Sequence, residues 1–406
     1  MVIREPKIGL DSDLAKLVVL MFASSSLFGV TWSILAPYLR SLGFTAAEYG
    51  GLGALGLYFS LAVTLVSGWL SDRVGSRILI LAGTLASSLS LVMLSTGHTY
   101  LIYASFCLSG LGMGAVHVAG IVLASRIVSE SLVHSMSYTT ASSMIGGGLG
   151  TLVGGWIPVI LGRLAGLSMV ESYRIVLLIA GILSPLPALL ILPRVREVVR
   201  TGESETKKRD IEVRMPWGTL VRLLIINMII SLGAGMSIHI IDYYFVAKFK
   251  VTSRELGTVL GAQNTIMGAT MLFMPTLSSR VGGPLRAYIL VAAPSIPLIV
   301  AMTLTSSYTI AAALYIVRSI LMNVANPLYQ AFEMSLIPSE YRGRGASLIS
   351  VAWQIPAGIG RYVGGHMMDR HIESPLLATS ALYTLAFTLL AILFSDHVFT
   401  RKTPRS

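Results

Sequence analysis

Long uninterrupted apolar runs recur along the whole of this 406-residue chain. Each run is about 20 residues or longer, which is the length that a helix needs to cross roughly 30 Å of hydrocarbon. The runs do not alternate apolar with polar residues, so they do not indicate the strands of a membrane barrel. They predict an all-α membrane protein with twelve transmembrane helices, at 14–39, 49–70, 78–96, 99–125, 132–160, 173–192, 218–246, 256–278, 287–305, 309–336, 345–368 and 376–396.

The composition agrees with a lipid environment. Apolar residues make up 54% of the chain and charged residues only 12%, which is too little polar surface to cover a water-soluble globule of this size. The net charge of +11 does not indicate a nucleic-acid partner, because most Lys and Arg gather in alternate loops. This positive-inside bias predicts a multi-pass protein of the cell membrane with both termini cytoplasmic.

Three local matches, in the same order, relate the two halves of the chain. LSDRVG at 70–75 matches LSSRVG at 277–282, and FTAAEYG at 44–50 matches VTSRELG at 251–257, both at an offset of 207. The glycine-rich segment 148–155 matches 358–365 at an offset of 210. The repeat predicts a bundle at 1–192, a polar cytoplasmic linker at 193–217 and a second bundle at 218–406. Two parallel repeats around a midplane cavity are typical of transporters that work by alternating access.

The loop between the second and third spans, GWLSDRVGSR at 68–77, carries a specific pattern. Gly75 permits a turn and Gly68 allows close helix approach. Asp72 is suited to accept hydrogen bonds from the N–H groups of a helix start, and Arg73 and Arg77 lie at the level of the lipid head groups. We therefore expect these residues to form a cytoplasmic gate.

This loop resembles the G-x-x-x-D-R-x-G-R-R signature of the major facilitator superfamily, with Ser76 replacing a basic residue. The segment 337–344, which contains Arg342, is similar to the P-x-x-x-R-G-R loop of the same family. The resemblance implies two pseudo-symmetric six-helix bundles and a monomeric secondary transporter that needs no cofactor and is not an enzyme. It also implies a small-molecule substrate and a coupling ion. Glu333, at the cytoplasmic end of the tenth span, is expected to join the gate through an ion pair or, alternatively, to contact substrate.

Charges within the predicted spans indicate the coupling chemistry. A charge at the bilayer centre costs about 2.5–3.5 kcal/mol on insertion scales, so Asp242, Arg318 and Arg361 need partners or a wet cavity. Helical geometry of about 100° per residue brings His239 near the face of Asp242, where the two side chains are spaced to relay a proton. Asp242 either neutralises one arginine as a buried ion pair or takes part in proton coupling while an arginine attracts an anionic substrate group.

Polar and aromatic side chains in the spans provide candidate substrate ligands. His117 is alternatively a hydrogen-bonded structural residue, and Trp32 a packing residue. No P-loop and no metal-ligand spacing occurs in the sequence, so an ion gradient is the expected energy source. We expect a proton-coupled transporter of a small organic anion or metabolite; the alternative is a proton-driven exporter of lipophilic drugs or other amphipathic compounds. The candidate ligands are Trp32, His117, His239, Asn264, Arg318, Asn323, Gln330, Trp353, Gln354 and Arg361.

Overall fold

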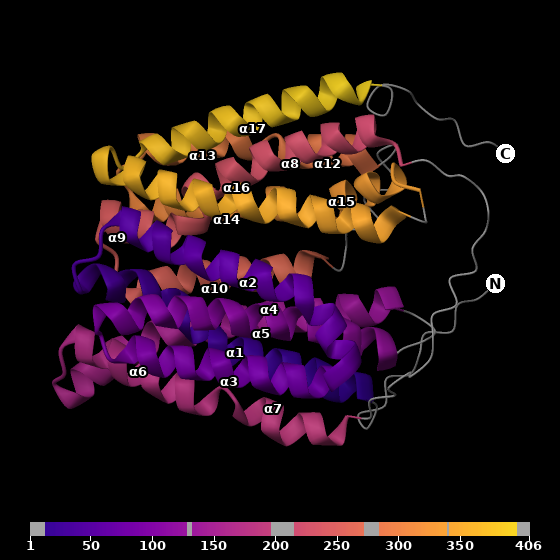
Figure 1. Ribbon diagram of the computed structural model, residues 1–406. Helices are drawn as coiled ribbons and strands as arrows, with labels where there is room; N and C mark the ends of the chain where they lie inside the picture. Colours follow the sequence, from indigo (N-terminus) through magenta and orange to yellow (C-terminus); the bar gives the residue numbers. More distant parts are fainter. Residues whose placement is uncertain (1–12, 128–131, 196–214, 272–283, 339–340, 396–406) are drawn as a thin grey trace. The chain divides into compact units, whose positions relative to one another are not determined.

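The computed structural model describes residues 13–127, 132–195, 215–271, 284–338 and 341–395. All regular secondary structure in these residues is helical (Figure 1). The amino-terminal part contains α1 (Asp13–Ser41), α2 (Ala46–Val74), α3 (Ser76–Ser95), α4 (Thr99–Ile127), α5 (Leu132–Ala165), α6 (Met169–Leu183), α7 (Leu186–Ile191) and the 3-10 turn η1 (Leu192–Arg194).

The carboxy-terminal part contains more and shorter helices, because several expected spans are interrupted. They are α8 (Trp217–Ser237), the 3-10 turn η2 (Ile238–Ile240), α9 (Ile241–Phe249), α10 (Ser253–Met271), α12 (Pro284–Ala292), α13 (Ser295–Leu304), α14 (Tyr308–Val324), α15 (Asn326–Ser335), α16 (Arg342–Arg370) and α17 (Ser374–Leu393).

Prolines mark three of the four interruptions within expected spans in the described structure, at Pro185, Pro294 and Pro327. Proline has no N–H for the helical ladder, so a helix breaks or kinks there. The fourth interruption, between α8 and α9, contains no proline.

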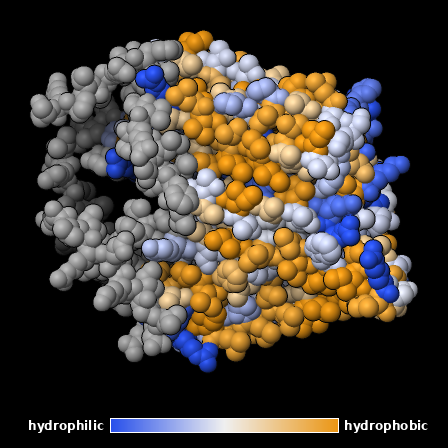
Figure 2. All heavy atoms as spheres, turned by 180° about the vertical axis from the view of Figure 1, so that it is seen from behind, coloured by the Kyte–Doolittle hydropathy of each residue, from blue (hydrophilic) through white to orange (hydrophobic). Residues whose placement is uncertain are grey.

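The prediction of an all-α membrane protein is confirmed. A helix, or an interrupted pair of helices, occupies each expected span, although the end of 256–278 falls outside the described residues. Among the described residues, ten helical segments are long and apolar enough to cross a membrane. Figure 2 shows hydrophobic side chains over most of the visible described surface, with the most hydrophilic ones mainly at its right edge and beside the grey atoms on the left. Lipid, rather than water, suits such a surface.

Packing divides the chain into two compact units, and each is described by itself. Unit 1 comprises Met1–Tyr38, Phe59–Thr201 and Ser253–Gly268; unit 2 comprises Leu39–Tyr58, Gly202–Thr252 and Ala269–Ser406. In unit 1, α3 packs against α4 and α6, whereas in unit 2, α8 packs against α16 and α17. The first part of α2 belongs to unit 2 and most of α10 to unit 1, so the units do not follow the sequence halves. The division into bundles at 193–217 stays a prediction.

Glycine lets α8 and α16 approach closely in unit 2. A Cβ atom on Gly360 would overlap the carbonyl oxygen of Leu232 and would lie 3.0 Å from the Cα atom of Gly235. Helices in lipid gain much of their association from such close contact, because lipid tails are as apolar as the side chains they replace. Gly360 belongs to the repeated segment 358–365, so the repeat includes a packing surface.

Gly360→Ala should therefore destabilise unit 2 by about 1–3 kcal/mol, because the added methyl group has no space. The matched change Gly218→Ala, at a position with nothing within 4 Å of the new methyl group, should be neutral or slightly stabilising. Thermal unfolding of the purified proteins in detergent measures both effects. Equal melting temperatures for the two variants would contradict the packing argument.

Candidate functional site

Unit 1 contains a partly open cavity of about 660 Å³. Its walls come from α1, α3, α4 and α5, with Asn264 contributed by α10 and Ser184 from the end of α6. The volume is in the range of roughly 300–1,000 Å³ that is typical of small-molecule sites. The cavity is therefore large enough to hold a drug-sized ligand.

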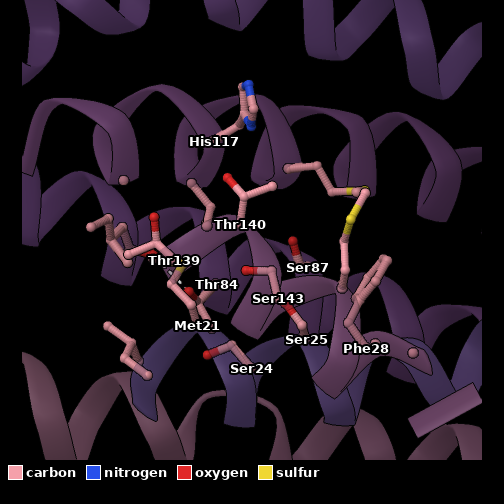
Figure 3. A pocket seen from close by; sticks show the side chains of 18 of the residues that line it. Met21, Ser24, Ser25, Phe28, Thr84, Ser87, His117, Thr139, Thr140 and Ser143 are labelled. Atoms are coloured by element: carbon pink, nitrogen blue, oxygen red, sulfur yellow. Dashed lines mark hydrogen bonds between the residues drawn. The ribbon is translucent and has the colours of Figure 1, made fainter. Parts of the chain in front are cut away.

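The lining combines apolar, thioether and hydroxyl groups. Figure 3 shows hydroxyl side chains from several helices, together with Phe28 and His117, around one space. Methionines are flexible and polarisable, so they adapt to ligands of different shape and make favourable contacts with aromatic rings. The lining includes Met21, Met113, Met144, Phe28, Trp32, Ser24, Ser25, Ser87, Thr84, Thr139, Thr140 and Ser143.

Some of these hydroxyl groups have no partner in the described part of the protein. A helical serine or threonine often donates to a carbonyl three or four residues earlier, as Thr84 does to Ile80 at 2.7 Å. Within the described part of the chain, Ser25, Thr140 and Ser143 make no such hydrogen bond. Their hydroxyl groups are therefore available to a ligand or to water in the cavity.

His117, on α4, is the one titratable side chain among the residues that line this cavity. In the part of the chain that the structure describes, it has no hydrogen-bond partner, so the expectation of a hydrogen-bonded structural histidine is not supported. Trp32 and Asn264, which the sequence also predicted as substrate ligands, line the same cavity. Trp32 is 45% exposed, so its ring is not a fully buried packing group.

Sequence reasoning missed the serine, threonine and methionine lining. A signal was present, because Thr140, Ser143 and Gly147 recur at the spacing of one helical face. The same spacing occurs at Ser25 and Gly29 on α1. Small residues at helical spacing usually indicate close helix packing, and Gly29 does pack against Gly147 here, where an added Cβ atom would overlap the carbonyl oxygen of Gly147. Both glycines also line the cavity.

Asp242 lies in the first turn of α9, directly after a break in the helix. The backbone leaves α-helical geometry at Ser237, with φ −134°, and at Ile240, with φ −125°. The expected unbroken helical face near His239 and Asp242 is therefore wrong, because the rotation per residue changes within η2. No hydrogen bond joins His239 to Asp242 in the described structure, and Nδ1 of His239 is buried without a partner.

The partners of Asp242 are a tyrosine and its own chain. Its side chain is 7% exposed, the hydroxyl of Tyr49 donates to Oδ2, and the N–H of Tyr243 donates to Oδ1 at 2.8 Å. Arg361 is near enough to interact electrostatically with Asp242. No arginine comes within 4 Å of this carboxylate among the described residues, so the alternative of a direct ion pair is not supported.

Both arginines have neutral partners instead. Nη2 of Arg318 donates to the hydroxyl of Tyr383 at 3.2 Å, and its guanidinium lies 5.7 Å from the centroid of that ring. Arg318 is only 1% exposed, and its Nε has no hydrogen-bond partner within the described residues. Nη1 of Arg361 donates to the carbonyl oxygen of Gly53 on α2 at 2.7 Å. Neither arginine lines the cavity of unit 1.

Glu333 forms a second buried polar cluster in unit 2. It is 3% exposed, and Nδ2 of Asn227 donates to its Oε1 at 2.5 Å. Tyr329 also bonds to Glu333. The expected ion pair is not seen in the described residues. The gate role of Glu333 stays a prediction.

The remaining candidates are dispersed over unit 2. Nδ2 of Asn323 donates to the carbonyl oxygen of Ser319 at 2.8 Å, and Nε2 of Gln354 donates to the hydroxyl of Ser350 at 3.0 Å. Gln330 is exposed and Trp353 half-buried. The structure gives these four residues no shared site, and their substrate role stays a prediction.

The loop motif is described only in part. Gly75 joins α2 to α3 with φ 94°, a backbone conformation that favours glycine, as the motif predicted. Arg73 and Arg342 are exposed and Arg77 is half-buried. The surroundings of Gly68 and Asp72 lie outside the described set, so the capping role of Asp72 stays a prediction.

Comparison with known proteins gives concordant matches. The family model "Major Facilitator Superfamily" matches residues 17–361. The chain is 20% identical over 374 residues to the quinolone resistance protein NorA of Staphylococcus aureus strain MSSA476, an alignment that covers 91% of this chain and 93% of that protein. NorA of strain MRSA252 is 19% identical over the same length, with the same coverage.

Solved structures share the fold. A bacterial homologue of the human lysosomal transporter Spinster, in an inward-facing and unoccupied conformation, matches with a TM-score of 0.75 and 14% identity, covering 97% of this chain and 98% of that one. The nucleoside transporter NupG matches with a TM-score of 0.65 and 14% identity, covering 96% of this chain and 99% of the other. At such identities the likeness concerns the fold alone.

Proposed function

Because the chain belongs to the major facilitator superfamily and is therefore a membrane transporter, we propose that it is a proton-coupled exporter of lipophilic or amphipathic compounds. The observation that carries this proposal is the cavity of about 660 Å³, whose lining contains one titratable side chain, His117. The proposal includes action as a monomer in the cell membrane, with both termini cytoplasmic.

The chemistry of the lining supports this substrate class. The described lining residues include no Asp, Glu, Lys or Arg, so no permanently charged side chain among them would select a substrate of opposite charge. Binding energy comes mainly from apolar surface removed from water, at about 25 cal/mol per Å². Methionines allow different shapes to pack, and the hydroxyl groups of Ser25, Thr140 and Ser143 orient the polar end of an amphipathic ligand.

The relatives support the direction of transport. The staphylococcal proteins that match along nearly their whole length are named for quinolone resistance. Resistance to a drug is consistent with its removal from the cell. For this chain, at 20% identity, export is a proposal that rests on that similarity together with the apolar cavity.

Asp242 supports proton coupling. It is a buried carboxyl group in a predicted span, and its direct hydrogen-bond partners, Tyr49 and the backbone of Tyr243, carry no charge. A carboxyl group in such surroundings can be held either ionised or protonated, because the hydroxyl of Tyr49 both donates and accepts. Gain and loss of that proton would then link the gradient to the transport cycle.

Removing the hydroxyl groups of Thr140 and Ser143, which have no partner among the described residues, should weaken ligand binding without abolishing it. We expect Thr140→Val and Ser143→Ala each to raise the Kd for a fluorescent amphipathic dye about two- to tenfold, since each removes one hydrogen bond worth roughly 0.5–1.5 kcal/mol. Thr84→Val is the matched control, because the hydroxyl of Thr84 already donates to Ile80. Fluorescence titration of the detergent-purified protein measures all three. A larger loss in Thr84→Val than in Thr140→Val would contradict the proposed site.

Removing the charge of Asp242 should uncouple transport from the proton gradient. In proteoliposomes, Asp242→Asn is expected to transport the dye at the same rate with and without a pH gradient, whereas the unmodified protein is accelerated by the gradient. Glu373→Gln is the control, because Glu373 is a half-buried acid just beyond α16, and this variant should keep its response to the gradient. Asp369 is less suitable as a control, because it contacts α2. A fully gradient-driven Asp242→Asn protein would show that Asp242 is structural.

Transport of a small organic anion is the second candidate, and Arg318 favours it. This guanidinium is almost completely buried, and its Nε has no partner in the described structure. A buried cation with a free donor is suited to a carboxylate. Uptake of monocarboxylates or dicarboxylates into proteoliposomes, lost in Arg318→Ala but retained after Thr140→Val, would favour the anion. Uptake unchanged by Arg318→Ala and Arg361→Ala would exclude it.

A further inference from the structure

The first turns of α2 are bound to the last turns of α16 within unit 2. Oδ1 of Asp369 accepts a hydrogen bond from the N–H of Ala46, and Oδ2 accepts one from the N–H of Ala47, both at 2.9 Å. One carboxylate thus holds two consecutive N–H groups of a helix more than 300 residues away in the sequence.

The start of α2 also has a local cap, which leaves the N–H groups of Ala46 and Ala47 open. The N–H groups of a first helical turn have no partner within the helix, so a local side chain usually caps them. Here Thr45 and Glu48 already form a reciprocal cap: the N–H of Thr45 donates to Oε2 of Glu48 at 2.8 Å, and the N–H of Glu48 donates to Oγ1 of Thr45 at 3.2 Å. Asp369 therefore adds an attachment between helices to a helix end that has its own cap.

Arg361 supplies a second attachment, about two turns before Asp369 on α16. Its guanidinium donates to the carbonyl oxygen of Gly53, about two turns into α2. The backbones also touch, since a Cβ atom on Gly50 would overlap the carbonyl oxygen of Arg361. Asp369 and Arg361 thus bind α2 at two points about two helical turns apart. Gly50 lets the backbones of α2 and α16 come close together between these points.

The attachment is also suited to release. Asp369 is exposed, so its carboxylate and the N–H groups of α2 regain water when they separate. Hydrogen bonds exchanged for water have a small net free energy, so this contact can form and break within a transport cycle. If a deeply buried ion pair held the two helices instead, their separation would leave two charges without partners, at a large cost in free energy.

We propose that Asp369 and Arg361 form a clamp that holds α2 on α16 and stabilises the conformation closed on the side of the membrane where α2 begins. Alternating access requires that the helices of the two repeats meet on the closed side and separate on the open side. Asp369 and Arg361 are then positioning residues for transport. Arg361 acts on a backbone carbonyl group of α2, a different role from that of a substrate ligand.

The test measures which side of the membrane reaches the cavity. In a Cys107→Ser background, Ser25→Cys places one thiol in the cavity lining, and a membrane-impermeant maleimide is applied to right-side-out or inside-out vesicles. We expect Asp369→Ala to raise the labelling rate from the side where α2 begins roughly three- to tenfold, the shift that loss of a capping interaction produces, and to lower the rate from the opposite side. Arg361→Gln should act in the same direction.

Glu373→Ala is the matched control. Glu373 lies just beyond α16 and pairs with Lys248 at 3.1 Å, without contacting α2 in the described structure, so its loss should leave both labelling rates unchanged. If Asp369→Ala does not fold, Asp369→Asn, which keeps one acceptor oxygen, should show a smaller rise in the same direction, and Asp369→Glu should restore most of the original rates.

Two outcomes would overturn the clamp. One is an unchanged rate in an Asp369→Ala protein with a normal melting temperature. The other is a rise from both sides, which would indicate general loosening of the fold. Labelling needs neither substrate nor proton gradient, so the clamp and the proposed exporter function can fail independently.

Discussion

Water is missing from the interior of a bilayer, and the rest of this structure depends on that absence. Each backbone N–H and C=O group must find a partner within the protein, so the chain spans the membrane as helices. Where a helix is interrupted, as between α8 and α9, the local 3-10 turn keeps part of the ladder. At this interruption the backbone is surrounded by protein, since Ile240 and Ile241 are 1% and 3% exposed, and it places Asp242 in the first turn of a new helix.

The same shortage of water governs the charged groups. Three charged side chains in the predicted spans are held by groups that the protein itself supplies: Asp242 by a tyrosine, Arg318 by another tyrosine, and Arg361 by a backbone carbonyl group. Hydrogen bonds to charged groups are worth about 1.5–3 kcal/mol, so such partners offset part of the cost of burial. Neutral partners stabilise the two arginines without cancelling their charge, so the excess of arginine over acid in these spans remains.

Local sequence patterns were sufficient to predict the positions of most helices, but not to predict most residues of the candidate site. The length of an apolar run depends on the thickness of the bilayer, so most helix positions could be predicted from it, and glycine-rich 358–365 indicated the close packing that Gly360 displays. Trp32, His117 and Asn264 were also predicted to line a site. The predicted placement of His239 near the face of Asp242 was wrong, because a helical wheel assumes an unbroken helix and the chain is interrupted at η2.

Other features of the site depend on contacts that no local pattern contains. The hydroxyl group of Thr84 donates to Ile80, whereas that of Thr140 has no partner among the described residues, although both are threonines on a helix. The contact of Asp369 with α2 joins segments that are distant in the sequence. Such features follow from tertiary packing, which a run of residues along one helix does not reveal.

The hydroxyl groups and methionines of the cavity have a consequence for how the substrate selectivity of such a protein can evolve. A site that recognises its ligand through one fixed charge loses its function when that charge is replaced. In the proposed exporter, the cavity of unit 1 would spread recognition over many weak contacts from α1, α3, α4 and α5. Single substitutions in the lining would then shift the preference among compounds, while the surrounding helices would stay packed through their glycines. A new selectivity would need only single substitutions, and the protein would stay functional at each step.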